Sequence, residues 1–261
     1  MIGDDRLIKD GFYCMDCFDG MTLIDDKSID MILCDLPYGT TQCSWDVVIP
    51  FEPLWEEYKR IIKDNGAIVL FGMEPFSSYL RISNIDMYKY DWIWDKVKGT
   101  GFLNAKKQPM RNHEIISVFY KRQCKYYPQM TENHERKTSL KRRNPPQTKV
   151  YGKMDKVTYY DSTVRYPRSI QVFSTDTQIS SIHPTQKPVA LCEYLIKTYT
   201  DAGDLVLDNC AGSCSTGIAC HNTGRRFIGF EKNEEIFNRA NERLNEHKAQ
   251  MNLFDIGLER K

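Results

Sequence analysis

Apolar and polar positions follow two different periods along this chain, and the two periods alternate. Short apolar runs are typical of buried strands. Within residues 12–35 they predict two strands, a short one and a second one that ends at Asp35. Further strands are predicted at 67–71, 90–94, 114–120, 205–208 and 226–231. Apolar positions three and four residues apart predict helices at 51–63, 75–82, 189–199, 216–222 and 233–248. This alternation predicts a doubly wound α/β fold, whose mostly parallel sheet carries helices on both faces.

Two stretches depart from the regular pattern. Asn65-Gly66 is expected to end the helix at 51–63. Residues 96–112, between the strands at 90–94 and 114–120, are rich in Gly, Lys and Asn and are predicted to form a loop. Residues 123–182 are basic, polar and rich in tyrosine, with little periodicity. We therefore predict one domain split by a small insert, with the domain halves at 1–122 and 183–261.

The net charge of +1 conceals an uneven distribution. Residues 121–168 contain 13 basic and four acidic side chains, so this segment carries +9 and the rest of the chain about −8. A strongly positive region on an otherwise acidic protein points to a polyanionic partner.

Composition narrows the class of protein. With 261 residues, 41% of them hydrophobic, the chain can bury a sizeable core. No apolar run reaches the roughly 18 residues of a membrane span, and no signal-peptide pattern is present, so we expect a cytoplasmic protein. The nine cysteines are scattered, as is typical of reduced thiols. The pair Cys14/Cys17 lacks a second pair at zinc-ligand spacing, and no metal is predicted.

Two constellations carry candidate chemistry. Asp35-Leu36-Pro37-Tyr38 follows a predicted strand, where ligands bind in open α/β sheets. A carboxylate beside a flat ring suits a planar ligand with an exocyclic amino group, although a strand-to-turn junction with an exposed tyrosine is an equal alternative. The second constellation, 208–217, follows a strand and opens a helix whose N–H groups can bind an anion.

The strand after this loop ends in Glu231, which is placed to accept hydrogen bonds from ribose hydroxyls. Together, the loop and the glutamate indicate an adenosine-containing ligand; the alternative is a tight turn with an incidental surface glutamate. Lys187 in His183-Pro184-Thr185-Gln186-Lys187-Pro188 could meet an anion at the same edge, or be a solvated surface charge.

Along the chain, the Asp35–Tyr38 motif comes first, the basic insert second and the 208–217 loop third. Motifs in this order resemble those of the β group of amino-methylating DNA methyltransferases, which use S-adenosylmethionine. The resemblance covers about residues 16–243, except the insert. It implies a class I, Rossmann-like methyltransferase fold of the seven-stranded type and methyl transfer to N6 of a flipped adenine in DNA. Asp35 and the Leu36 carbonyl would accept the two N6 hydrogens, Pro37 would complete the motif, and Tyr38 would stack on the base.

The resemblance also implies a cofactor site and a DNA-binding surface. Asp16 would contact the cofactor's adenine amino group, Glu231 its ribose and Lys187 its carboxylate. The methionine part would lie against the loop, through Asp208, Ala211, Gly212, Ser213 and Thr216. The insert would bind DNA through Arg136, Lys137, Lys141, Arg142, Arg143 and Lys149. Family members often form homodimers, and some have restriction partners.

Two positions depart from the family pattern. Leu36 replaces a proline, but only its carbonyl is used. Cys214 replaces a loop glycine, and its Cβ would crowd the methionine part if the backbone has a positive φ. Two alternatives stay open: an N4-cytosine methyltransferase, which more often has Ser in place of Asp35, and a catalytically degenerate DNA-binding protein, which Cys214 favours.

Overall fold

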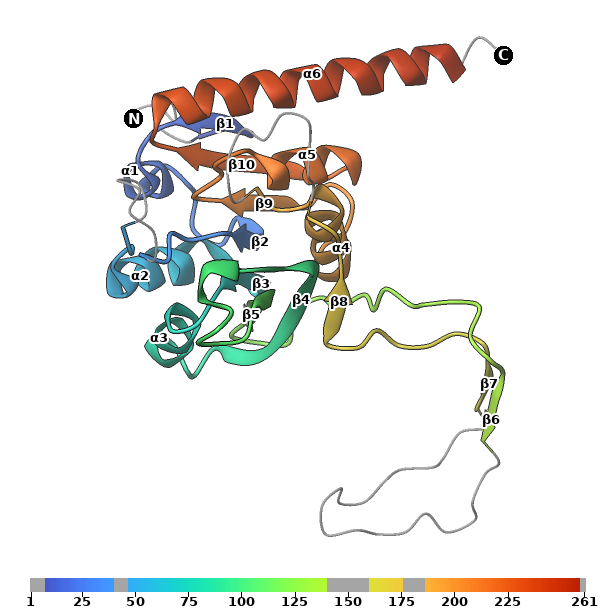
Figure 1. Ribbon diagram of the computed structural model, residues 1–261. Helices are drawn as coiled ribbons and strands as arrows, with labels where there is room; N and C mark the ends of the chain where they lie inside the picture. Colours follow the sequence, from blue (N-terminus) through green and yellow to red (C-terminus); the bar gives the residue numbers. More distant parts are fainter. Residues whose placement is uncertain (1–7, 40–46, 140–159, 176–185, 259–261) are drawn as a thin grey trace. The chain divides into compact units, whose positions relative to one another are not determined.

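A computed structural model describes residues 8–39, 47–139, 160–175 and 186–258 (Figure 1). The chain divides into two compact units. The larger unit comprises Met1–Tyr127 and Ser169–Lys261, and the smaller one comprises Pro128–Arg168. The smaller unit therefore lies within the predicted insert, whose two ends belong to the larger unit.

The larger unit is built on an eight-stranded sheet with the order β1-β10-β9-β2-β3-β5-β4-β8. All neighbouring pairs are parallel except β3/β5 and β5/β4. The predicted α/β fold is confirmed, and β8 adds an edge strand to the seven expected. The strands are β1 (Gly11–Cys14), β2 (Ile29–Cys34), β3 (Ile62–Gly72), β4 (Tyr88–Thr100), β5 (Arg111–Phe119), β8 (Ile170–Val172), β9 (Leu205–Asp208) and β10 (Arg226–Glu231).

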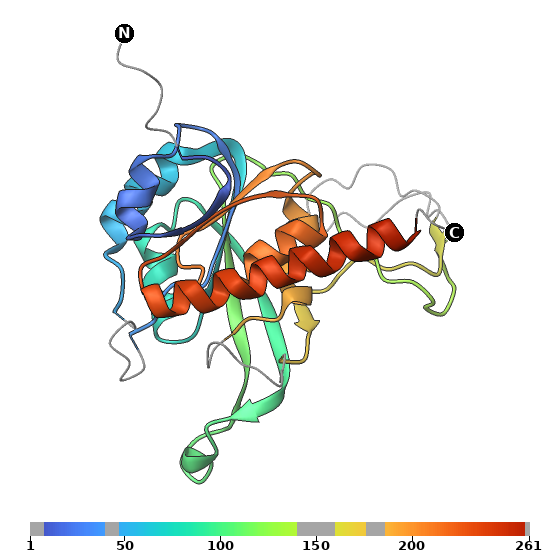
Figure 2. The same ribbon diagram turned by 90° about the horizontal axis from the view of Figure 1, so that it is seen from above.

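Helices cover both faces of this sheet (Figures 1 and 2). Successive side chains of a strand point to opposite faces, so Ile32 of β2 packs with α1, α2 and α3, whereas Leu33 packs with α4 and α5. A third cluster joins α5 to α6. The helices are α1 (Cys17–Thr22), α2 (Phe51–Ile61), α3 (Phe76–Ser83), α4 (Val189–Tyr199), α5 (Ser215–Asn222) and α6 (Glu234–Leu258).

Two predicted boundaries are wrong, each because strand pairing extends beyond the apolar run. Helix α2 ends at Ile61 rather than at Asn65-Gly66, since Ile62 already pairs with Ile29 of β2. Most of the predicted loop at 96–112 belongs to a hairpin, in which β4 and β5 pair as far out as Thr100 and Arg111.

The smaller unit contains a two-stranded antiparallel sheet of β6 (Lys137–Ser139) and β7 (Tyr160–Ser162). Arg136 forms a two-point ion pair with Asp161, with N···O distances of 2.7 and 2.6 Å. Thr131 and Arg165 form a further backbone bridge.

Among residues 8–39, 47–139, 160–175 and 186–258, no helix is long and apolar enough to cross a bilayer. The same residues contain no group of three or more His, Cys, Asp or Glu side chains placed to hold a metal ion.

Candidate active site and cofactor pocket

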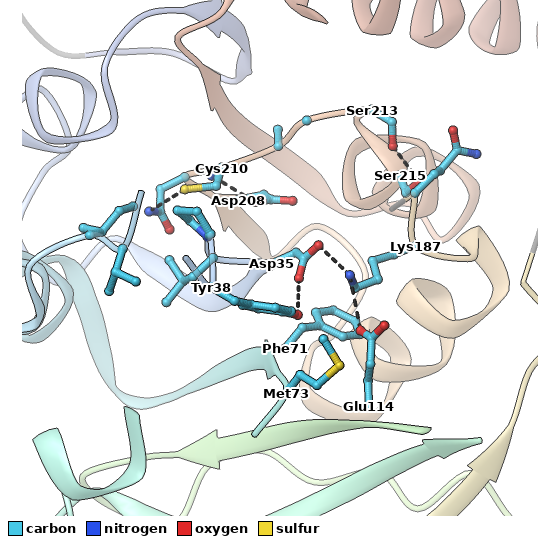
Figure 3. Close-up of a pocket in the computed structure, with 18 of the residues that line it drawn as sticks. Asp35, Tyr38, Phe71, Met73, Glu114, Lys187, Asp208, Cys210, Ser213 and Ser215 are labelled. Carbon is cyan, nitrogen blue, oxygen red and sulfur yellow. Dashed lines mark hydrogen bonds and ion pairs between the residues drawn. The ribbon is translucent and has the colours of Figure 1, made fainter. Parts of the chain in front are cut away.

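A cavity of about 1240 Å³ opens at the carboxyl ends of β2, β9 and β10 (Figure 3). Every residue predicted to be catalytic or to bind the cofactor lines it: Asp16, Asp35, Leu36, Pro37, Tyr38, Lys187, Asp208, Ala211, Gly212, Ser213, Thr216 and Glu231. Pockets for a single small ligand usually measure roughly 300–1000 Å³. This cavity therefore has room for a second ligand beside the first.

Asp35 directly follows β2 and keeps 27% of its side chain exposed toward the cavity. The Tyr38 hydroxyl donates a hydrogen bond to Asp35 Oδ1 at 2.5 Å. The Tyr38 ring packs against Phe76, with 5.0 Å between the ring centroids. Leu36 is buried in the core, which fixes the backbone between the carboxylate and the ring.

Asp35 belongs to a chain of alternating charges, of which Figure 3 labels Asp35, Lys187 and Glu114. Lys187 Nζ lies 2.5 Å from Asp35 Oδ2 and 3.3 Å from Glu114 Oε2, and Lys96 Nζ lies 3.0 Å from Glu114 Oε1. Lys96 and Glu114 come from β4 and β5 and were not predicted as site residues. The anionic groups that contact Lys187 are thus two carboxylates of the protein itself.

The electrostatics of this chain depend on burial and on pairing. Burial raises the pKa of Asp35, although the Lys187 ammonium acts in the opposite direction. Burial disfavours the charge of Lys187 as well, but Asp35 and Glu114 outweigh it and raise its pKa. Burial also opposes ionisation of Glu114, yet Lys187 and Lys96 lower its pKa. Lys187 and Glu114 are therefore held in their charged forms.

The loop after β9 is tied to the end of β10. Glu231 Oε2 accepts a hydrogen bond from the Gly212 N–H at 3.1 Å, and its Oε1 accepts one from the Asn233 N–H at 2.8 Å. Asp208 Oδ1 accepts from the Cys210 N–H at 3.2 Å. Each oxygen of Glu231 has a second lone pair that a ligand could use.

Cys214 is the N-cap of α5 and has the left-handed φ of +59° on which the expected crowding depends. Its side chain, however, is fully buried with Ile218, Ala240 and Leu244. Ser213 and Ser215 line the cavity and Cys214 does not. The structure thus gives no support to the expected clash with the methionine part.

Asp16 and Gln186 also line the cavity, where their polar side chains can reach a ligand. Asp16 caps α1, where its side chain accepts a hydrogen bond from the Phe18 N–H at 2.9 Å. Gln186 precedes Lys187 in the His183–Pro188 motif and has no predicted role, and both polar atoms of its amide are buried without a hydrogen-bond partner. Since such atoms are costly to leave unpaired, Gln186 is suited to bind a ligand in the cavity.

The predicted DNA-binding residues are described only in part. Arg136, paired with Asp161, and Lys137, the first residue of β6, are exposed residues of the smaller unit. The others, Lys141, Arg142, Arg143 and Lys149, lie outside the described residues, as do His183, Pro184 and Thr185.

Residues 29–242 match a family model for N6 and N4 methyltransferases described as DNA methylase. The chain belongs to this DNA methylase family. It is 30% identical to the type II methyltransferase M.HpaI of Haemophilus parainfluenzae, over 97% of this chain and 77% of that protein. It is 26% identical to the DNA adenine methyltransferase YhdJ of Escherichia coli K12, over 85% and 78% of the two chains.

The crystal structure of the M1.HpyAVI complex with S-adenosylmethionine has the same fold, with a TM-score of 0.61 and 23% identity over 90% of this chain and 98% of that one. The chain is therefore a DNA methyltransferase that uses S-adenosylmethionine. The cavity suits this cofactor, because helix α5 starts at its wall and Glu231 and Gln186 offer polar atoms to it.

Asp208 should make stability depend on pH. Burial raises its pKa from 3.8 to about 6. A carboxyl group with a raised pKa favours the fold most below its unfolded pKa and loses that contribution as the pH rises to the folded pKa. Above that pH, the ionised group costs up to about 3 kcal/mol. We expect Asp208→Asn to melt at a higher temperature than the wild type at about pH 8, but not at about pH 4.

Thermal melts at both pH values measure this difference, and Asp25→Asn, a change at an exposed position, is the control that should be neutral at both. Equal melting temperatures of Asp208→Asn and the wild type at about pH 8 would contradict the prediction.

Cys214→Gly should leave the affinity for S-adenosylmethionine within about threefold of the wild type, because the removed side chain does not line the cavity. Stability should change little, since relief of the left-handed backbone, worth about 1 kcal/mol, offsets the loss of a buried thiol. Calorimetric titration gives the affinity.

Gly212→Ala is the contrasting variant. Gly212 lines the cavity at a φ of +49°, where a Cβ is strained, so affinity should fall at least about tenfold. A gain in affinity of about tenfold or more in Cys214→Gly would show that the crowding predicted from the sequence is real.

Proposed function

We propose that this methyltransferase acts on the N6 amino group of an adenine that has been flipped out of DNA. The observation that carries the proposal is that Asp35 and Tyr38 share one cavity with the 208–217 loop and Glu231. An acceptor base and a methyl donor can therefore lie side by side. Flipping is needed because N6 is paired and inaccessible inside a duplex.

Asp35 and the Leu36 carbonyl would accept the two N6 hydrogens of the base. Both oxygens of Asp35 are engaged in the structure, one by Tyr38 and the other by Lys187. We infer that the entering amino group replaces the Tyr38 hydroxyl at Oδ1, while Lys187 keeps its hold on Oδ2. The released Tyr38 ring could then stack on the base, an interaction worth roughly 1–3 kcal/mol.

Bound S-adenosylmethionine supplies a sulfonium methyl group, which is already a strong electrophile. The residues of the chain then need only to place the amino lone pair in line with it. Asp35 orients this lone pair by its hydrogen bond and is close enough to take up the proton that the methylated nitrogen loses. Burial raises the pKa of the neighbouring Cys34 thiol to about 12, so it would be a poor nucleophile and no covalent intermediate is invoked.

On the cofactor side, Glu231 would hold the ribose hydroxyls and Asp16 the adenine amino group. The residues Asp208, Ala211, Gly212, Ser213 and Thr216 would surround the methionine part. We propose a changed role for Lys187, which orients Asp35 instead of binding the cofactor carboxylate, because Asp35 and Glu114 already occupy its ammonium group. The unpaired amide of Gln186 can donate to that carboxylate.

N4-cytosine methylation is the alternative, because the family covers both reactions. Asp35 favours adenine, since the N4 subgroup more often has Ser at this position. A cytoplasmic location and a homodimer are further expectations of the proposal.

Asp35→Ala should lower methyl transfer at least about 100-fold, because it removes the group that orients the amino nitrogen. Binding of S-adenosylmethionine should be nearly unchanged. Transfer of a labelled methyl group to DNA measures the first effect, and calorimetric titration measures the second. Asp86→Ala, at an exposed position, is the control and should be fully active.

Retained methylation by Asp35→Ala would refute the assignment. Nucleoside analysis of the methylated DNA separates N6-methyladenine, the expected product, from N4-methylcytosine. If the wild type neither binds S-adenosylmethionine nor methylates DNA, the degenerate DNA-binding alternative holds. Sequencing DNA from expressing cells, with modified bases identified, would give the target sequence.

The insert should supply salt-dependent affinity for DNA. Each lost phosphate contact flattens the plot of log affinity against log salt concentration by about 1, so a Lys141, Arg142 and Arg143 triple alanine variant should flatten it by about 3. Arg136→Ala should have a smaller effect, because Asp161 already pairs with that side chain. An unchanged slope in the triple variant would remove these residues from the DNA contact.

A further inference from the structure

The hairpin of β4 and β5 ends in a tip, 101–110, at the edge of the active-site cavity. Thr100, Gly101, Asn104, Gln108 and Pro109 all line the same cavity as Asp35. Figure 2 shows the green hairpin projecting away from the sheet. A macromolecule whose reactive group enters the cavity would therefore meet this tip.

The tip presents two large apolar side chains to solvent. Phe102 is 78% exposed and Leu103 is 98% exposed, the largest exposure among the described large hydrophobic residues. Burial of such side chains is favourable, and adjacent exposed apolar residues often mark a contact surface.

Backbone hydrogen bonds hold this tip in a defined turn. Gly101 adopts a left-handed φ of +88°, and a short 3-10 helix follows at Phe102–Asn104. The Asn104 N–H donates to the Gly101 carbonyl at 2.9 Å, and the Lys107 N–H donates to the Asn104 carbonyl at 2.8 Å. The turn thereby places both apolar side chains at the end of the hairpin.

The charge of the hairpin identifies the partner. Residues 97–113 include four exposed cations and no acidic residue: Lys98, Lys106, Lys107 and Arg111. Cations of this kind contact phosphates and position a protein on a duplex. Apolar wedges such as Phe and Leu, inserted between base steps, unstack and kink DNA. A second copy of the chain would explain the apolar residues but not the unbroken positive charge around them.

We propose that this tip is a wedge that enters duplex DNA at the target base. Phe102 and Leu103 fill the space that the extruded base leaves, while Lys106 and Lys107 contact the flanking phosphates. The inference rests on the proposed function, because a base is extruded only if it is the methyl acceptor. It adds a second DNA-binding element to the predicted insert.

The test uses the full chain with Phe102→Ser and Leu103→Ser combined. A wedge lowers the cost of opening a paired site. On a duplex carrying the target site, kcat/KM should therefore fall at least about tenfold. On the same duplex with the target adenine mismatched, and so already loosened, the fall should be less than about threefold. Fluorescence of 2-aminopurine at the target position, which rises when the base leaves the stack, should fall in the variant.

The matched control is Ile82→Ser combined with Ile85→Ser, two residues of the same unit that are 72% and 61% exposed; it should match the wild type on both duplexes. Lys106→Ala with Lys107→Ala should flatten the salt dependence of DNA binding by about 2. Unchanged S-adenosylmethionine binding in the serine variant shows that it is folded.

Equal losses on the paired and mismatched duplexes, or no loss on either, would overturn the wedge. A change in oligomeric state of the serine variant, measured by sedimentation, would also overturn it and assign the tip to a contact between copies. An inactive wild type would refute the proposed function, whereas an active wild type with an equally active serine variant would refute the wedge alone.

Discussion

The parallel pairing of β2 with β9 is the constraint on which the active site depends. Met31 pairs with Val206 and Ile32 with Leu207, so Asp35 and the loop that begins at Asp208 leave the sheet at the same edge. Parallel strands require crossover connections, and the helices of these crossovers bury both faces of the two strands. The apolar side chains that hold the strands in register therefore also fix the distance between the two halves of the cavity, although these halves are far apart in the sequence.

The charged groups of the cavity show how this frame is used. An isolated buried charge is costly, but the series Asp35, Lys187, Glu114 and Lys96 alternates in sign, so each inner member is compensated by two neighbours. The hairpin contributes two of the four groups. The same hairpin that orients Lys187 thus also carries the exposed tip, which connects the geometry of Asp35 with the surface that we propose meets DNA.

The sequence predicted the elements that carry the motifs better than those between them. Strands β9 and β10 and helix α4 have the predicted bounds, because an uninterrupted apolar run or a clear helical period determines them. The end of α2 and the length of β4 and β5 depend on pairing with distant strands, which local pattern does not encode. Lys96 and Glu114 were not predicted as site residues for the same reason, since only the register of the hairpin places them together. The direction of the Cys214 side chain likewise depends on how α5 packs against α6.

Burial of polar side chains around the cavity lowers the stability of the fold, so a purely structural role does not explain why these residues are polar. Asp208 is almost fully buried with a raised pKa, and the amide of Gln186 lacks hydrogen-bond partners. A hydrophobic side chain at either position would remove an unfavourable desolvation term. Polar groups of this kind become favourable when a ligand supplies further hydrogen-bond partners, and both residues line the same cavity. Their placement is therefore best explained by a bound cofactor. Binding of the cofactor stabilises the folded state and so offsets the stability that these buried polar groups cost.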